Sequence, residues 1–307
     1  MYDSLITPAR IHPWGSEELL EATEQDRARI VQAAPVRRLQ QKTQVFPLDV
    51  KASVRSRLTH SLEVQETGRQ ISRRILAALP AGTVCEGAFI NLVEMACLLH
   101  DVGNPPFGHF GEQVMSQWLA QSLDELFARA HDQLPSPQWA ELRQDLLVFD
   151  GNAQSLRLVH SLHEMNLTLG QLAALCKYPQ QPLLHHPQGY GQHHGWTSKR
   201  GIFFSEQPLY RALGQSLGLA PGCRHPLVYI MEAADDISYC IADLEDAVDR
   251  RILTQGELLA ALRSADEGDY MVTLLEEALA SERGFFPHFR QHLTRDLVAL
   301  AAQTYVS

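Results

Sequence analysis

The chain has 307 residues, of which 45% are apolar and 20% charged, a balance typical of a globular protein with a sizeable core. No stretch approaches the roughly 18 uncharged apolar residues of a membrane-spanning helix. Met1–Trp14 also lacks a basic segment followed by an apolar one, so we expect neither membrane association nor a secretory signal. The formal net charge of −10 argues against nucleic-acid binding over the whole surface.

The segment 27–57 departs from this acidic average, since it holds eight basic residues and one acid, Asp49. The basic residues are Arg27, Arg29, Arg37, Arg38, Lys42, Lys51, Arg55 and Arg57. This local excess could hold a polyphosphate or a nucleic-acid backbone. The alternative is a solvated helix face.

The cysteines are odd in number, far apart in the sequence and include no C-x-x-C pair. This pattern predicts reduced thiols in a cytoplasmic protein rather than a disulfide framework. The five cysteines are Cys85, Cys97, Cys176, Cys223 and Cys240.

Apolar residues recur at three- and four-residue steps along most of the chain, with no internal repeat and no convincing β-alternation, which predicts a mainly α fold. Ser16 and Thr59 are the expected N-caps of the first two long helices, and Pro35 should end the first or begin another. The segments 131–137 and 179–201 are expected to be loops. The expected helices cover about 16–34, 59–79, the segment before His100, the segment after Glu112, 139–149, 152–165, 169–177, 226–248 and two or three stretches beyond Thr254.

The segment Leu98–Glu112 reads L-L-H-D-V-G-N-P-P-F-G-H-F-G-E and ends an apolar run with His100 and Asp101. A Gly/Pro-rich turn follows, and His109 and Glu112 then begin another periodic segment. Burying an imidazole beside a carboxylate is costly unless something pairs with them. A divalent cation is the simplest partner, because imidazole nitrogen and carboxylate oxygen are both ligands. The alternative is a helix end with a solvated histidine and a capping aspartate.

The helix predicted from Pro226 carries a packed apolar stripe and, beside it, Asp235, Tyr239 and Asp243 at four-residue steps. Three polar groups in line beside such a stripe suggest a cavity. The alternative, a salt-bridged outer face, better suits the charges from Asp246 onward. The two histidine pairs within 179–201 could bind metal, although adjacent histidines in a loop are usually solvated.

Four candidate ligands together offer two imidazole nitrogens and two carboxylates: His60, His100, Asp101 and Asp235. Such a set, with positions left open, suits Mn²⁺, Mg²⁺, Fe²⁺, Co²⁺ or Ni²⁺ better than a closed structural zinc site. The ion could orient a phosphoryl oxygen or lower the pKa of a water. His109 and Glu112, three residues apart, could form a general base and its orienting carboxylate.

The order H…HD…D resembles the HD superfamily of metal-dependent phosphohydrolases. Longer stretches resemble the deoxyguanosinetriphosphate triphosphohydrolases of the enterobacterial type, and the resemblance runs from about Glu18 to the last residue. These stretches are R-R-L-Q-Q-K-T-Q-V-F-P (37–47), R-L-T-H-S-L-E-V (57–64), residues 98–112, F-D-G-N-A-Q (149–154) and E-A-A-D-D-I-S-Y-C-I-A-D-L-E-D-A-V (232–248).

The resemblance implies an all-α, HD-domain helical bundle with additional helices, and hydrolysis of dGTP to deoxyguanosine and triphosphate by water attack at the α-phosphorus. It implies Mn²⁺ or Mg²⁺ on the four ligands named above, with Asp235 preferred over Asp236, and His109 with Glu112 as the catalytic pair. The implied substrate contacts are Gln44, Val45, Tyr239 and Asp243 around the deoxyribose, and Arg57, Lys177 and Asn152 around the phosphates.

Members of that family are longer chains. We therefore expect residues 1–307 to form a single HD-type domain with a motif-bearing core at 35–250, and 251–307 to begin an incomplete C-terminal helical region. Homo-oligomers and single-stranded DNA are possible partners. Two alternatives stay open: an HD phosphohydrolase acting on another nucleotide (other dNTPs, a monophosphate or guanosine tetraphosphate), and a catalytically weak protein that binds nucleotide or single-stranded DNA.

Overall fold

The computed structural model describes the chain except for residues 1, 3, 48–53, 131–137, 180–200 and 266–268. The described residues form helices and no sheet, apart from two isolated β-bridges, so the predicted all-α class is confirmed. Both segments with predicted loops, 131–137 and most of 179–201, lie outside the described residues. The helices are α1 (Leu19–Gln32), α2 (Ala34–Arg38), α3 (Arg57–Ala78), α4 (Glu86–Leu99), α5 (Gly108–Ala130), α6 (Trp139–Leu147), α7 (Gly151–Arg157), α8 (Leu169–Ala174), α9 (Gln207–Leu217), α10 (Pro226–Asp249), α11 (Gln255–Ala265), α12 (Asp269–Ala280) and α13 (Phe285–Val306).

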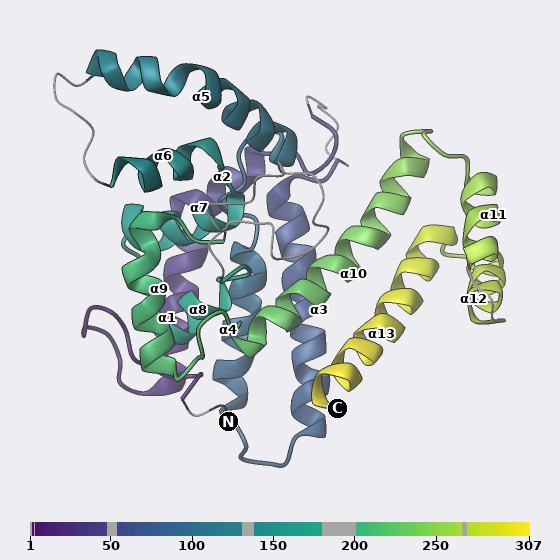
Figure 1. Ribbon diagram of the computed structural model, residues 1–307. Helices are drawn as coiled ribbons and strands as arrows, with labels where there is room; N and C mark the ends of the chain where they lie inside the picture. Colours follow the sequence, from purple (N-terminus) through teal and green to yellow (C-terminus); the bar gives the residue numbers. More distant parts are fainter. Residues whose placement is uncertain (1, 3, 48–53, 131–137, 180–200, 266–268) are drawn as a thin grey trace.

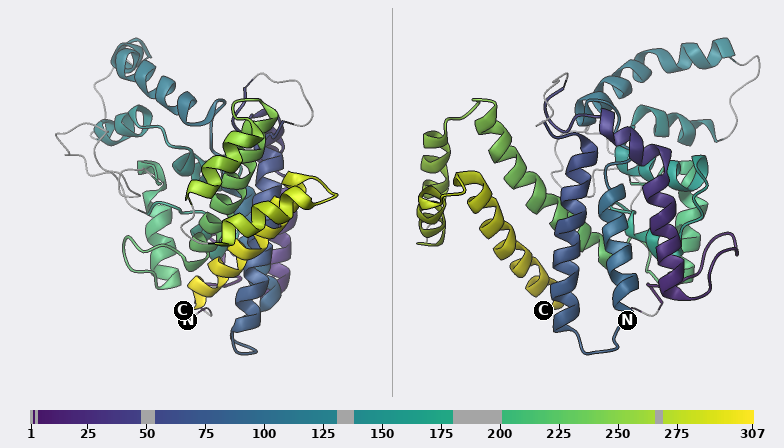
Figure 2. Two further views of the ribbon diagram at one scale, coloured as in Figure 1. Left: turned by 90° about the vertical axis from the view of Figure 1, so that its right-hand side faces the viewer. Right: turned by 180° about the vertical axis from the view of Figure 1, so that it is seen from behind.

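The centre of the molecule is α4, which lies side by side with α1 and α3 and is crossed by α10 (Figures 1 and 2). Most of α4 is buried, including Phe89 and Leu92. Gly68 of α3 marks the closest approach: a Cβ built there would lie 2.6 Å from Cys97 Sγ of α4 and 3.6 Å from Ala234 of α10. Only a glycine lets three helices meet so closely. His60 and Asp235 lie on α3 and α10, and His100 directly follows α4.

The structure corrects two helix starts. The N-cap of α1 is Glu18 and not Ser16. The Glu18 carboxylate accepts hydrogen bonds from the backbone amides of Leu20 and Glu21. The N-cap of α3 is Ser56, and Thr59 is the third helical residue of a capping box with it. Both predicted caps are real hydrogen-bonding residues, displaced from the cap position by a neighbour with a better-placed side chain.

Other predicted elements change in extent. The single helix expected over 152–165 is α7 followed by a π-helix at Leu158–Leu162, and the helix expected to reach Lys177 ends at Ala174. Pro35 lies in the first turn of the short α2, which agrees with the expectation that it begins another helix. The sequence reading missed α9, although its buried leucines recur at four-residue steps.

The helices beyond Asp249 pack around a small core of their own, in which Phe285 and Phe289 of α13 meet Leu274 and Leu275 of α12. Helix α13 then runs back beside α10 and α3 (Figure 2). Helices α5 and α6 lie together at the side of the molecule away from α11 and α12 (Figure 1). All five cysteines are free thiols. Within the described ranges, no helix combines the length and the apolar character that crossing a membrane requires.

The start of α10 predicts a pH dependence of stability. His225 is its N-cap: Nδ1 accepts the Leu227 amide, and Nε2 lies 3.1 Å from the Leu5 carbonyl oxygen. Burial lowers the pKa of His225 from 6.5 to about 4, and protonation at Nδ1 would break the cap. The unfolded chain therefore binds this proton below pH 6.5 while the folded chain does not. We expect stability to be complete above pH 6.5 and to fall by about 3 kcal/mol between pH 6.5 and 4, since one pKa unit corresponds to about 1.4 kcal/mol.

Urea unfolding across this pH range measures the effect. The control is His225→Asn, which keeps a capping acceptor but removes the titrating group. Its stability should depend less steeply on pH over this interval. An unchanged slope would mean that His225 does not carry the dependence.

Candidate metal and phosphate site

Three of the four predicted ligands meet where α3, α4 and α10 come closest. His60 lies on the first turn of α3, His100 follows the last residue of α4, and Asp235 lies in the middle of α10. His60 Nε2 is 3.1 Å and His100 Nε2 is 3.5 Å from Asp235 Oδ1. One ligand atom from each residue lies within 4.8 Å of the other two. Two imidazoles and one carboxylate therefore converge on one point.

The protein fixes which nitrogen of His100 faces this point. His100 Nδ1 lies 2.7 Å from the Cys97 carbonyl oxygen, which can only accept, so Nδ1 carries the proton and the Nε2 lone pair faces the carboxylates. A backbone carbonyl behind a histidine is the usual support of a metal-binding imidazole. The ring of His60 stands edge-on to that of His100, with centroids 5.4 Å apart.

The charge state of Asp235 suits a metal ligand. Burial alone would raise the pKa of this carboxyl, but His100, His60 and Lys177 around it outweigh burial and hold the pKa well below its usual range. The carboxylate is thus ionised at neutral pH, as coordination requires.

Asp101, the fourth predicted ligand, is turned toward Arg57. Its Oδ2 lies 2.5 Å from the Arg57 guanidinium and 3.6 Å from His100 Nε2, and its Oδ1 accepts from the Asn104 side chain. The structure thus places Asp101 at the edge of the three-residue cluster. Its ion pair with Arg57 joins the first residue of α3 to the turn that follows α4.

The predicted catalytic pair is formed at the start of α5. His109 Nδ1 lies 2.7 Å from Glu112 Oε2, and Glu112 Oε1 accepts the Gly151 amide at 2.8 Å. The His109 side chain is 71% exposed, whereas that of Glu112 is 14% exposed. The imidazole is therefore held through one nitrogen while its other nitrogen is open to solvent or substrate.

A strained turn places this pair beside Arg57. Phe107 and Gly108 both have positive φ, 67° and 54°, which is unusual for phenylalanine. A Cβ built on Gly108 would lie 2.4 Å from an Arg57 Nη atom. A side chain at position 108 would displace the guanidinium, so this glycine lets α5 start directly against Arg57, one residue before His109.

The predicted phosphate contacts lie at two places around the cluster. Lys177 Nζ lies 4.0 Å from Asp235 Oδ2 and 3.7 Å from Glu232; burial lowers its pKa, but the neighbouring Tyr178 and Asp235 raise it above its ordinary value. Asn152 is at the start of α7, where both its amide and its side chain contact Asp150. It adjoins Gly151, the residue that holds Glu112.

The predicted sugar contacts come from two segments. Tyr239 and Asp243 lie one and two turns beyond Asp235 on α10, and a hydrogen bond to Asp243 is the main reason that the pKa of Tyr239 is raised. Tyr239 is 46% and Val45 43% exposed. The Gln44 amide donates to the Arg55 carbonyl, which places it beside the start of α3.

Several buried polar atoms around the cluster lack a hydrogen-bond partner among the described residues. They are Gln44 Oε1, Arg57 Nε, His60 Nδ1 and Ser61 Oγ. Buried polar atoms are rarely left unpaired in folded proteins, so Gln44 Oε1 and Arg57 Nε are available to a polar ligand.

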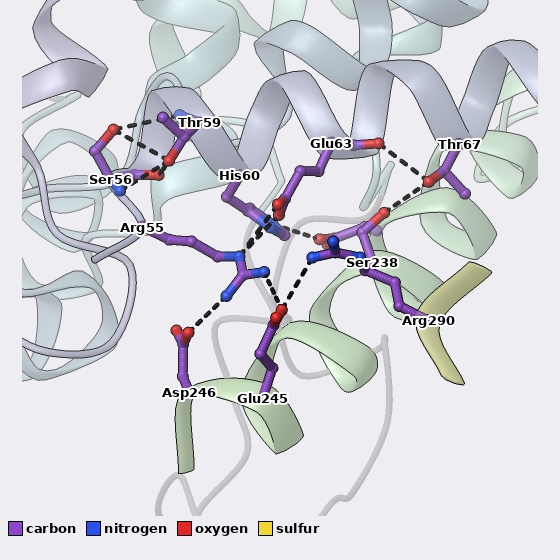
Figure 3. A network of polar contacts seen from close by, with 11 residues as sticks. Arg55, Ser56, Thr59, His60, Glu63, Thr67, Ser238, Glu245, Asp246 and Arg290 are labelled. Carbon is purple, nitrogen blue, oxygen red and sulfur yellow. Dashed lines mark hydrogen bonds and ion pairs between the residues drawn. The ribbon is translucent and has the colours of Figure 1, made fainter. Parts of the chain in front are cut away.

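Most described cations of the basic segment 27–57 are engaged within the molecule. Arg27 pairs with the buried Glu94, and Arg55 binds Glu63, Glu245 and Asp246 (Figure 3). Lys51 lies outside the described residues, as do the histidine pairs of the 180–201 loop. The excess of positive charge thus ties helices together more than it forms an open surface.

The sequence reading missed three groups that hold the site. Lys42 donates to the Val102 and Asn104 carbonyls and so fixes the turn after His100 and Asp101. Asn104 orients Asp101, and the Gly151 amide orients Glu112. Backbone carbonyls and amides carry no residue signature, so only the folded chain reveals these contacts.

Comparison with known proteins identifies the class. The HD domain family matches residues 57–143, which contain His60, His100 and Asp101. The chain is therefore an HD-domain protein.

Two relatives narrow the class. A protein of Pseudomonas aeruginosa named "Probable deoxyguanosinetriphosphate triphosphohydrolase" is 50% identical over 248 residues, covering 77% of this chain and 49% of the relative. The "Deoxyguanosinetriphosphate triphosphohydrolase" of Enterobacter sp. (strain 638) is 40% identical over an alignment of 336 positions, gaps included, which covers 96% of this chain and 66% of the relative. The chain belongs to the deoxyguanosinetriphosphate triphosphohydrolase family. It spans about half to two thirds of the length of these curated relatives.

Proposed function

We propose that this protein hydrolyses dGTP to deoxyguanosine and inorganic triphosphate by metal-dependent attack of water on the α-phosphorus. The observation that carries the proposal is the convergence of His60, His100 and Asp235 on one point, flanked by the cations Arg57 and Lys177. The names of the two relatives support the choice of substrate.

The donor set fits a divalent cation. Two imidazoles and an ionised carboxylate face one another, and Asp101 stands 3.6 Å from His100 as a further oxygen ligand after a rotation away from Arg57. A mixed set of two nitrogens and two oxygens with open positions suits Mn²⁺, and it admits Mg²⁺ where the phosphate oxygens of the substrate complete the coordination shell. When bound, the ion supplies Lewis-acid polarisation and orients a phosphoryl oxygen.

His109 is the proposed general base. Glu112 engages Nδ1 and is itself held by the Gly151 amide, so the imidazole presents Nε2 outward in a fixed orientation. Nε2 can take a proton from the attacking water, and the neighbouring carboxylate stabilises the imidazolium that forms.

Arg57 and Lys177 are the proposed phosphate contacts, with Asn152 as a further polar contact. Dispersed negative charge on the phosphoryl oxygens is the main feature that a phosphoryl-transfer site has to stabilise. Arg57 is suited to bridge two phosphate oxygens with its planar guanidinium. Asp101, which pairs with Arg57 in this structure, would then turn from Arg57 to the metal ion and leave the guanidinium for the phosphate.

Gln44, Val45, Tyr239 and Asp243 are the proposed deoxyribose pocket. The unpaired Gln44 Oε1 is a ready acceptor for the 3′-hydroxyl, and the Tyr239 ring would crowd a 2′-hydroxyl. Tyr239→Ala should therefore lower the dGTP over GTP preference in kcat/KM by roughly tenfold, since rejection of an added hydroxyl by a pocket wall is modest.

The matched control is Tyr229→Ala. Tyr229 lies on the same helix with similar exposure but is ten residues away from Tyr239. The control should keep the preference of the unaltered chain. If both variants discriminate like the unaltered chain, Tyr239 is not a wall of the sugar pocket.

Product analysis tests the proposal. The chain is incubated with dGTP and Mn²⁺, with GTP and dATP in parallel, and the products are separated by ion exchange. Deoxyguanosine and triphosphate in equal amounts from dGTP are expected. Phosphate or pyrophosphate as the first product would instead assign the site to another phosphohydrolase reaction.

A further inference from the structure

We propose that Glu277, His288 and His292 form a second metal site, which binds a transition-metal ion of the Zn²⁺ class and clips α12 to α13. One ligand atom from each of the three residues lies within 4.8 Å of the other two. These residues lie beyond the segment matched by the HD domain, and they are separate in sequence from the His60 cluster. The proposal does not depend on the proposed dGTP hydrolysis.

The helical repeat builds this arrangement. His288 and His292 are four residues apart on α13, so their rings lie on one face, nearly parallel at 13° with centroids 4.1 Å apart. Two histidines at this spacing on one helix are a recurrent pair of metal ligands.

The third ligand is placed by the small C-terminal core. Ala278 and Leu274 of α12 are buried against Phe285 and Phe289 of α13, which fixes how the two helices face each other. Glu277 precedes Ala278, and its Oε2 lies 3.9 Å from His288 Nε2. That separation is too long for a hydrogen bond. Two metal–ligand bonds of about 2.1 Å can span it.

The hydrogen-bonding state of His288 points to a missing ligand. His288 Nε2 is buried and has no hydrogen-bond partner among the described residues. A buried ring nitrogen without a partner, 3.9 Å from a carboxylate oxygen, is available to bind a cation together with that carboxylate.

The neighbouring positive charges do not oppose a cation strongly, because they are paired. Arg290 contacts Glu245 at 3.0 Å, and Arg295 contacts Asp296 at 2.8 Å. Asp296 lies close enough to interact electrostatically with His292. Arg295 also interacts electrostatically with Glu277, so this carboxylate and Asp296 together offset the charges of Arg295 and of the ion.

The ligand types select the metal. Two imidazoles and one carboxylate with a fourth position for water suit Zn²⁺, Co²⁺, Ni²⁺ or Cu²⁺, whereas Mg²⁺ and Ca²⁺ prefer oxygen ligands. Because the ligands come from two helices, binding should stabilise the folded C-terminal helices.

The experiment measures bound Zn²⁺ by equilibrium dialysis and the Tm with and without Zn²⁺. The starting protein carries His185→Gln, His186→Gln, His193→Gln and His194→Gln, so that these histidine pairs do not contribute. His288→Gln/His292→Gln should remove one equivalent of Zn²⁺ per chain and the rise in Tm that goes with it. Asp235→Ala should leave this equivalent in place, which separates it from the cluster at His60.

Two further variants keep the test decisive. Glu277→Gln alters a side chain that is 57% exposed and should weaken Zn²⁺ binding about tenfold without affecting the fold. His12→Gln/His163→Gln removes two exposed histidines elsewhere and should change nothing. The proposal is wrong if the 288/292 variant binds as much Zn²⁺ as the starting protein, or if Glu277→Gln binds it as tightly.

Discussion

His109→Ala should lower kcat for dGTP hydrolysis by at least about 100-fold and leave the metal content unchanged. A positioned general base contributes about 10²- to 10⁴-fold to proton transfer, and Glu112 holds the His109 imidazole through Nδ1. The metal should stay because His109 is not among the residues that converge with Asp235. The measurements are steady-state kinetics with dGTP and metal analysis of the purified variant.

The control for His109→Ala is Phe110→Ala, the next residue along α5, whose side chain is 67% exposed. Because both side chains project outward, neither change should unfold the protein. A His109→Ala variant that keeps most of its turnover, with metal bound, would remove His109 from the role of base. Metal loss in that variant would instead make it a ligand.

Asp235→Ala should release the metal and abolish turnover. Among the described carboxylates, only that of Asp235 lies within 3.6 Å of both His60 Nε2 and His100 Nε2. Its removal therefore leaves the two imidazoles without the carboxylate ligand that they share. It also removes one of the carboxylates that lie near Lys177. We expect less than about a tenth of the Mn²⁺ affinity and no detectable triphosphate at ordinary Mn²⁺ concentrations.

Asp236→Ala is the matched control, since Asp236 is the next residue on α10, is exposed, and is not among the residues that converge with His60 and His100. It should bind Mn²⁺ and turn over dGTP like the unaltered chain. A reversed pattern, with metal lost on changing Asp236 and retained on changing Asp235, would refute the assignment of the ligand.

The helical class was predictable because a helix that buries one face needs apolar residues at three- and four-residue steps, and this spacing is visible in the sequence. The helix starts were less predictable, because several residues near one terminus can accept hydrogen bonds from the same backbone amides. Ser56 rather than Thr59 is the N-cap of α3, and Glu18 rather than Ser16 is the N-cap of α1. Helix α9 was not predicted from the sequence because its pattern is weak. Its three buried leucines fit one helical face, but the segment is short and follows a polar, Pro- and Gly-rich stretch.

The residues of the site were predictable to the extent that their chemistry is unusual. A buried His-Asp pair and an aspartate beside an apolar stripe stand out in sequence, and the structure brings His60, His100 and Asp235 together. The orientation of Asp101 toward Arg57 and the grip of Lys42 on the following turn were not predictable. These features depend on which segments become neighbours in the folded chain. The close approach of α3, α4 and α10 at Gly68 is one such arrangement.

The most direct test of the central claim is dGTP hydrolysis in H₂¹⁸O with Mn²⁺, followed by mass analysis of both products. Attack of water on the α-phosphorus breaks the bond to the 5′-oxygen, so we expect one ¹⁸O atom in triphosphate and none in deoxyguanosine. Label in deoxyguanosine would show attack at carbon. Labelled phosphate or pyrophosphate would show cleavage at another phosphorus, and either outcome would contradict the reaction assigned to this site.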